Sequence, residues 1–234
     1  KILSQLTDYF RPHLPYLKAQ HEFLLLLDVV YAKARYAQEI DAILPEIDKK
    51  KRSIEYKKAY HPLLLQSHRI EDKVTYPQDV YLHPEKRIVV ISGPNAGGKS
   101  ITLKTVGLLQ LMLQSGMLIP VHESSKACLF EQILTDIGDN QSIENHLSTY
   151  SYRLKNMKYF LRKCNANTLF LIDEFGTGSD PELGGALAEV ILEDFYGREA
   201  FGIITTHYSN LKALANELPF MGNANMQFDN KTRA

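Results

Sequence analysis

An octet near the middle of the chain constrains its fold more than any other feature. Residues 93–100 read Gly-Pro-Asn-Ala-Gly-Gly-Lys-Ser, which fits the phosphate-binding pattern of Gly, four residues, then Gly-Lys and Ser or Thr. An apolar run at 88–91 precedes the octet, and a long segment with helical periodicity follows it. A strand that leads through glycines into a helix N-terminus presents backbone N–H groups to a phosphate chain. The octet therefore predicts a nucleoside triphosphate site rather than a fortuitous glycine-rich turn.

The balance of charge limits what this chain can bind by itself. Lys plus Arg and Asp plus Glu each number 27, so the formal net charge is zero. A surface that holds nucleic acid needs clustered Lys and Arg, so we expect only weak DNA binding by this piece, although a local basic patch stays compatible with the total. The 234 residues suffice for one large domain or for one domain with an appendage.

Cysteine usage and apolar runs indicate a cytoplasmic location. Cys128 and Cys164 form no CxxC pair, which favours reduced, partly buried thiols over a disulfide or a metal site. There is no secretory signal, and the apolar run at 23–27 is broken by Asp28, far short of a membrane span. Because residue 1 is Lys rather than Met, we expect the chain to be a fragment of a longer protein.

The chain divides by pattern into a helical part and an alternating part. Residues 1 to about 50 are predicted to be helical, with a short amphipathic stretch that ends at 11–15 and a long helix over 17–44 that Pro45 stops. Beyond it strands alternate with helices, which predicts an α/β domain with a mainly parallel sheet over 56–234, after a helical segment over 1–55. The strands are expected at 63–65, 79–82, 88–92, 131–136, 168–172, 201–205 and 221–228, and the helices at 98–114, 147–162, 182–195 and 209–216.

The residue types of the octet suit phosphate binding. Gly93, Gly97 and Gly98 let the backbone curl around oxygens where a Cβ would collide or would forbid the dihedrals. Lys99 places a positive charge near the β- and γ-phosphates, and Ser100 offers a hydroxyl to Mg²⁺.

Acidic residues follow a strand that is apolar along its whole length. The run at 168–172 is typical of a strand buried on both faces, and it leads directly into Asp173 and Glu174. A carboxylate at the tip of such a strand suits the second Mg²⁺ position, and the acid after it can accept a hydrogen bond from an attacking water. The plainer alternative is that the pair only caps the following turn. Further on, the Asp180-Pro181 pair can cap the next helix, whether or not it also has a functional role.

Two further residues have both a structural and a functional interpretation. His207 follows the predicted strand at 201–205; alone it would most often be structural, but its order after the other motifs favours a contact with the γ-phosphate. Ser148 lies in the polar segment 136–151, which runs into a helix, and is a plausible N-cap. The functional interpretation of Ser148 is that the helix N-terminus grasps a nucleotide held by a second subunit.

The order of these motifs and their residue identities resemble those of the ATPase domain of the MutS family of DNA-repair proteins, which is ABC-like. The motifs are Gly-Pro-Asn with Gly-Lys-Ser in the octet, Leu-Ser-Thr at 147–149, Asp-Glu-Phe-Gly at 173–176 and Thr-His-Tyr at 206–208. Three details look closest to the second bacterial branch, which lacks the mismatch-reading domain: the segment 136–144, the turn 179–181, and Tyr-His-Pro-Leu-Leu at 60–64. The match covers about residues 56–228. Residues 17–44 look like the family's long helix between its lever region and the ATPase.

The resemblance implies Mg²⁺-dependent ATP hydrolysis in a composite dimer site. Lys99, Glu174 and His207 would be catalytic, with Ser100 and Asp173 on the metal. Ser148 would reach the nucleotide from the partner subunit, and Thr75 or, as the better aromatic candidate, Tyr76 would contact the adenine. The residues expected on the nucleotide within the loop are Gly93, Pro94, Asn95, Ala96, Gly97, Gly98, Lys99, Ser100 and Ile101.

The resemblance also implies partners outside this chain. Full-length relatives are homodimers associated with branched DNA or with stalled ribosomes, and they drive a clamp on nucleic acid. We expect the family's dimerisation element to follow Ala234, and the clamp and a C-terminal nuclease-like module to lie outside this piece.

Two other functions stay open at this stage. One is an ATP-binding tether with little turnover; the other is an ATPase subunit of an ABC transporter. Against the transporter, the segment at 147–150 lacks the Gly-Gly-Gln of transporter signatures, and the long N-terminal helix has no place in that fold.

Overall fold

A fully parallel five-stranded sheet organises the part of the chain that carries the motifs. The computed structural model describes residues 1–48, 52–93, 98–138, 149–177 and 181–226. Every neighbouring pair of strands in this sheet is parallel, so the expected α/β class with a mainly parallel sheet is confirmed. The strands lie in the order β6 (Gln132–Asp136), β7 (Thr168–Ile172), β8 (Phe201–Thr205), β4 (Lys86–Ser92) and β9 (Phe220–Asn225).

A smaller mixed sheet lies beside it. Its order is β1 (Glu46–Ile47), β5 (Lys126–Ala127), β2 (Ile54–Ala59) and β3 (Gln78–Leu82). β3 was predicted from the sequence, but β2 was not, although its buried and half-exposed residues alternate over its first half. This alternation is the ordinary signal of a strand with one face in the core.

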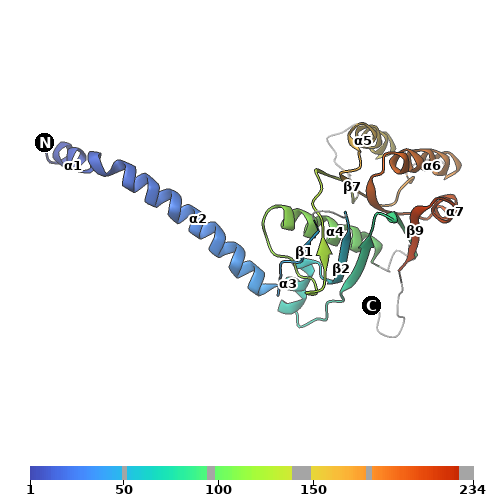
Figure 1. Cartoon of the computed structure of the whole chain (residues 1–234), viewed down its shortest axis with the longest axis horizontal. Coiled ribbons are helices and arrows are strands. Elements are labelled where there is room, and N and C mark those ends of the chain that lie inside the picture. Colours follow the sequence, from blue (N-terminus) through green and yellow to red (C-terminus); the bar gives the residue numbers. More distant parts are fainter. Residues whose placement is uncertain (49–51, 94–97, 139–148, 178–180, 227–234) are drawn as a thin grey trace.

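Helices cover both faces of the five-stranded sheet. Helix α4 (Lys99–Gln114) packs with the smaller sheet on one face, and α5 (Thr149–Lys163), α6 (Pro181–Gly197) and α7 (Ser209–Glu217) cover the other (Figure 1). Successive residues of β7 join opposite cores: Leu169 and Leu171 belong to the α4 side, and Phe170 and Ile172 to the other side. Each strand tip is thus fixed between two layers of packed side chains.

A long helical arm projects away from the two sheets (Figure 1). It consists of α1 (Ile2–Phe10), a 3-10 turn over Arg11–His13, and α2 (Leu14–Glu39). Helix α2 has 26 residues, or about 40 Å, and only Ala37 is buried. None of the helices in the described part of the chain combines the length and the apolar content that a membrane crossing requires.

The helical prediction for the first 50 residues is wrong beyond Glu39. The chain turns at Asp41, whose φ of +50° lies in the left-handed region, and Ile43 forms an antiparallel bridge with Ile119. The turn at Asp41 and this isolated bridge therefore end the helix before Pro45. At its other end, Pro15 lies in the first turn of α2, where a proline costs no backbone hydrogen bond.

The strand expected at 63–65 is also wrong, because these residues belong to α3 (Pro62–Ile70). Nδ1 of His61 accepts a hydrogen bond from the N–H of Leu64 at 3.4 Å, and Pro62 occupies the first turn. Both features start a helix, and they outweigh the apolar triplet. The remaining predicted strands and helices lie close to their expected positions, whereas the short strands β1 and β5, like β2, were not predicted. β9 ends at Asn225, and residues 227 and 228 lie outside the described residues.

Candidate nucleotide-binding site

The candidate site lies at the carboxyl edge of the five-stranded sheet. Because the carboxyl ends of parallel strands meet at one edge, segments far apart in the sequence come together there. In the loop after β8, the N–H of Thr206 donates a hydrogen bond to the carbonyl of Ile91 in β4 at 3.2 Å. In the loop after β7, the N–H of Phe175 donates a hydrogen bond to the carbonyl of Thr205 at 2.8 Å. These two bonds bring the three motif-bearing loops side by side.

The glycine loop enters α4 as expected. Gly93 has a φ of +129° and Gly98 a φ of +80°, and both values lie in the region that favours glycine. Ser100 and Ile101 lie in the first turn of α4. Pro94, Asn95, Ala96 and Gly97 lie outside the described residues, so their part in phosphate binding stays a prediction.

Lys99 is buried at the start of α4, with 3% of its surface exposed. Its Nζ donates to the carbonyl of Gly93 and lies 3.4 Å from Nε2 of His207. An ammonium has no acceptor, so Nε2 of His207 accepts in this contact. Burial lowers the pKa of Lys99, while the charges of Asp173 and Glu174 act in the opposite direction. The lysine folds back over its own loop, beside the histidine that was expected to share its phosphate.

One hydroxyl group links the two acidic residues. Oγ1 of Thr205 donates to Oδ1 of Asp173 at 2.5 Å and accepts the N–H of Glu174 at 2.8 Å. Asp173 is itself buried, and its N–H donates to the carbonyl of Asp136 at the tip of β6. Thr205 was missed in the sequence, although its place as the last residue of the predicted strand was a usable signal.

Glu174 has an unusual backbone conformation. Its φ of +49° is rare for a residue with a side chain and costs roughly 1–3 kcal/mol. Its carbonyl accepts hydrogen bonds from Nη1 of Arg153 at 2.9 Å and from Oγ1 of Thr177 at 2.8 Å. Glu174 is therefore held at both its N–H and its carbonyl, and no motif in the sequence pointed to Arg153.

The turn after Glu174 packs closely against α6 and the loop before α7. A Cβ on Gly176 would lie 2.8 Å from the ring of Tyr208, and one on Gly184 would lie 2.4 Å from the carbonyl of Gly176. The hydroxyl of Tyr208 donates to that same carbonyl at 3.2 Å. Helix α6 begins at Pro181, and Asp180, which was expected to cap it, lies outside the described residues.

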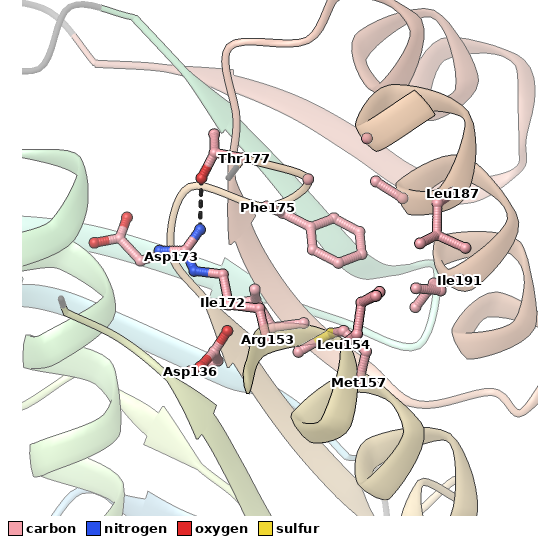
Figure 2. A pocket seen from close by; sticks show the side chains of 13 residues that line it. Asp136, Arg153, Leu154, Met157, Ile172, Asp173, Phe175, Thr177, Leu187 and Ile191 are labelled. Atoms are coloured by element: carbon pink, nitrogen blue, oxygen red, sulfur yellow. Dashed lines mark hydrogen bonds between the residues drawn. The ribbon is translucent and has the colours of Figure 1, made fainter. Parts of the chain in front are cut away.

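A small cavity lies beneath this turn, between α5, α6 and β7 (Figure 2). Its volume of about 30 Å³ suits one or two water molecules rather than a nucleotide. Arg153 and Thr177 lie at its polar end, and its other end is apolar. The apolar end is lined by Leu154, Met157, Ile172, Phe175, Leu187 and Ile191.

Other expected residues lie apart from the three strand tips. Tyr76 is 55% exposed, and Thr75 contacts His68 of α3 at 3.0 Å. Ser148 lies outside the described residues, directly before the first residue of α5. Cys128 and Cys164 are free and buried, and burial raises the pKa of each thiol to about 11.

A glycine loop leads from β4 into a helix, a buried lysine lies beside it, and two acids follow β7, on the far side of β8. These features define a phosphate-loop nucleotide-binding domain. Residues 89–234 match the family described as MutS domain V. The match covers more than half of the chain, so this chain belongs to the MutS family and contains its ABC-like ATPase domain.

The similar curated proteins carry the name Endonuclease MutS2, in agreement with the expected likeness to the second bacterial branch. The chain is 42% identical over 232 residues to the protein of Finegoldia magna and 42% identical to that of Bacillus cytotoxicus. It is 44% identical over 229 residues to the protein of Pediococcus pentosaceus. These matches cover 98–99% of this chain but only 28–29% of each relative. The chain therefore spans less than a third of the length of these relatives.

Proposed function

We propose that this chain hydrolyses ATP with Mg²⁺ at the carboxyl edge of its five-stranded sheet. The observation that carries the proposal is the convergence of Lys99, the Asp173–Glu174 pair and His207 from the ends of three parallel strands. Membership of a family whose domain V is an ATPase agrees with this chemistry. The residue roles below extend that assignment.

Ser100 and Asp173 would hold the magnesium ion. Both offer oxygen, the donor that Mg²⁺ prefers, and the hydrogen bond from Thr205 to Asp173 uses Oδ1, so we assign Oδ2 to the ion. Within the described residues no three His, Cys, Asp or Glu side chains are grouped to hold a metal. Binding would therefore depend on phosphate oxygens as well. When bound, Mg²⁺ neutralises charge that develops on the transferred phosphate.

Lys99 and His207 would contact the terminal phosphates. The carbonyl of Gly93 that Lys99 contacts belongs to the same loop, so the ammonium can exchange this neutral partner for a charged phosphate oxygen. Because Nε2 of His207 lies beside Nζ, the two side chains would reach the same end of the nucleotide. Bound phosphate would favour the charged form of the lysine, which burial disfavours.

The base of the nucleotide would lie near the segment before β3. Tyr76 remains our candidate for adenine stacking, because its exposed ring is available to a ligand. Gln78, two residues on, lies beside the loop: a Cβ on Gly98 would be 3.8 Å from its Nε2. Oε1 of Gln78 is buried without a partner among the described residues, and it lines a cleft of about 670 Å³. An unpaired buried acceptor suits a donor group of the nucleotide.

Turnover would require a second copy of the chain. Ser148 would approach the partner's nucleotide from the start of α5, so that each site is completed across a dimer. In the whole protein this closure would drive a clamp on nucleic acid, branched DNA or a ribosome, through regions beyond this chain. The cytoplasm would be the place of action.

The substitution Glu174→Gln tests the chemistry. The glutamine keeps the shape but cannot accept a proton from water, so turnover should fall at least about a hundredfold while ATP binding persists. Glu193→Gln, an exposed residue of α6, is the matched control and should change neither. Phosphate release and binding of a fluorescent ATP analogue would be measured in parallel. Undiminished steady-state hydrolysis by Glu174→Gln would remove Glu174 from this role.

The molecular mass in solution tests the dimer. Glu174→Gln protein should shift from monomer to dimer when Mg-ATP is added, and a further Ser148→Ala change should weaken that shift. Activity per subunit of the unmodified protein should rise with its concentration, as expected of a site formed by two copies. Full activity of a strictly monomeric protein would contradict the shared site.

A further inference from the structure

Arg153 links α5 to the turn that carries Glu174. We propose that Arg153 is a positioning residue: it holds Glu174 in its working conformation and ties that conformation to the start of α5. This inference rests on the proposed ATP hydrolysis, because it assigns a task to Glu174 only in that reaction.

The link consists of three groups that bond one another. Nη1 of Arg153 donates to the carbonyl of Glu174 at 2.9 Å and to Oγ1 of Thr177 at 2.5 Å. The same Oγ1 donates to the carbonyl of Glu174 at 2.8 Å. Figure 2 shows the guanidinium reaching from α5 across the end of β7 to Thr177. A charged donor makes stronger hydrogen bonds than a neutral one, so Arg153 is a firm attachment for this turn.

The attachment matters because Glu174 is held in a rare conformation. With a φ of +49°, its peptide would relax to negative φ unless its neighbours prevented this. Thr205 holds the N–H, while Arg153 and Thr177 hold the carbonyl. Without Arg153 one side of this grip weakens and the carboxylate changes direction. An error of about 1 Å in the placement of a reacting group can cost two orders of magnitude in rate.

Helix α5 is attached to the site through one face. Asn156, three residues after Arg153, lies on the same face of the helix and donates to Oδ1 of Asp136 at 3.1 Å. The carbonyl of Asp136 accepts the N–H of Asp173. The helix is therefore bonded to the tip of β6 and to the turn after β7. Since Arg153 lies one turn from Thr149, where α5 begins, a displacement of this helix end moves the arginine with it.

Arg153 would therefore connect the ATP that the partner holds to the ATP that this chain hydrolyses. The start of α5 is the element proposed to meet the partner's ATP, and Arg153 converts its position into the position of Glu174. A chain of bonds alone does not prove coupling, so the test must separate positioning from simple support of the fold.

The test compares Arg153→Gln with Lys158→Gln in the full-length protein. Both remove one positive charge from α5, but Lys158 is exposed. We expect kcat of Arg153→Gln to fall about tenfold with an unchanged dissociation constant for Mg-ATP, because the loss is confined to the reacting state. Lys158→Gln should match the unmodified protein. Arg153→Lys should recover only part of kcat, because a rotating ammonium does not hold two N–H groups in one fixed plane, as Nη1 of Arg153 does toward its two acceptors.

A double substitution with Thr177→Val tests the shared target. Thr177→Val removes the hydroxyl that joins Arg153 to Glu174, so the loss in kcat of the double variant should stay well below the product of the single losses. Thermal melting by circular dichroism would monitor the fold. If Arg153→Gln does not fold, Arg153→Lys and Thr177→Val carry the test.

Three outcomes would overturn the inference. A kcat of Arg153→Gln within about twofold of the unmodified value would deny the positioning role, as would a raised KM with unchanged kcat. Fully multiplicative losses with Thr177→Val would deny the shared target. Absence of hydrolysis by the unmodified protein would overturn the proposed function as well, whereas normal hydrolysis with an indifferent Arg153→Gln would overturn this inference alone.

Discussion

Helices α2 and α4 have similar apolar content but opposite surroundings. Helix α2 has 26 residues with one buried, whereas α4 has 16 residues of which ten are buried. In α4 the buried residues contact both sheets and fix the first turn with Lys99. In α2 the apolar residues of the run 23–27 are all more than half exposed. A helix is thus a fixed part of the site in one case and a free-standing arm in the other.

The difference shows that helix formation and helix burial are separate properties. A lone helix is marginally stable in water, so the order of α2 depends on its backbone bonds and on the few links at its C-terminal end. One such link is the hydrogen bond from Nζ of Lys33 to the carbonyl of Ser115, at 2.6 Å, just past the end of α4. A helix that is apolar all round normally has neighbours on every side. The first turn of α4 is therefore held by packing within this chain, whereas the apolar surface of α2 is available to other contacts.

The largest effect should come from shortening one leucine in each helix and comparing the losses in the free energy of unfolding. Leu109→Ala in α4 removes a fully buried side chain and should lower the free energy of unfolding by about 2–5 kcal/mol. Leu25→Ala in α2, where the side chain is 54% exposed, should change it by about 0.5 kcal/mol or less. Urea denaturation followed by circular dichroism measures both. Similar losses at the two positions would mean that α2 is packed in solution.

A smaller effect should appear at the link between the two helices. Lys33→Met keeps the length of the side chain but removes the bond to Ser115, at a cost of about 1 kcal/mol to the attachment of the arm. Amide hydrogen exchange should then accelerate in the last turns of α2 and stay unchanged around Lys99. Lys18→Met, an exposed change farther out on α2, serves as control. Equal acceleration by both variants would show that Lys33 does not attach the arm.

The smallest effect concerns how the free energy of unfolding depends on pH through His61, which lies near Lys104 of α4. Burial, followed by the charge of Lys104 in α4, lowers the pKa of His61 below its usual 6.5. The unfolded state then binds more protons, so stability falls as the pH drops from 6.5 through the folded pKa and levels off below it. His61→Asn, which can still cap α3, should remove this component, and Lys104→Gln should reduce it. Urea midpoints between pH 7 and 5 that are identical with and without His61 would contradict the assignment.

The parts predicted best from the sequence were those where burial alone sets the pattern. The strand at 168–172 was found at its full length because all five residues are buried. The triplet at 63–65 misled because apolar content without a period fits helix and strand equally, and the signal that decides was His61 followed by Pro62. β2 escaped notice although Ile54 and Tyr56 alternate with charged residues.

The sequence predicted the residues of the candidate site that lie in motifs, but not the residues that hold them in place. The motifs contain Lys99, Asp173, Glu174 and His207. The link from Arg153 to the Glu174 carbonyl joins a side chain to a backbone atom 21 positions away, and no local pattern encodes such a contact. Motifs report the groups that meet a ligand, whereas the bonds that aim those groups arise only when the elements have packed.

The order of strands in the main sheet has a consequence for synthesis. Strand β4, which delivers the glycine loop, is flanked by β8 and β9. Both neighbours are made more than 100 residues later, so at about 5–20 residues per second the ribosome needs roughly 5–25 s to supply them. During that interval the backbone N–H and C=O groups along both edges of β4 have no native strand to pair with. The nascent chain thus passes through an interval in which chaperones, or a neighbouring copy on the same messenger, can reach β4 before β8 and β9 do.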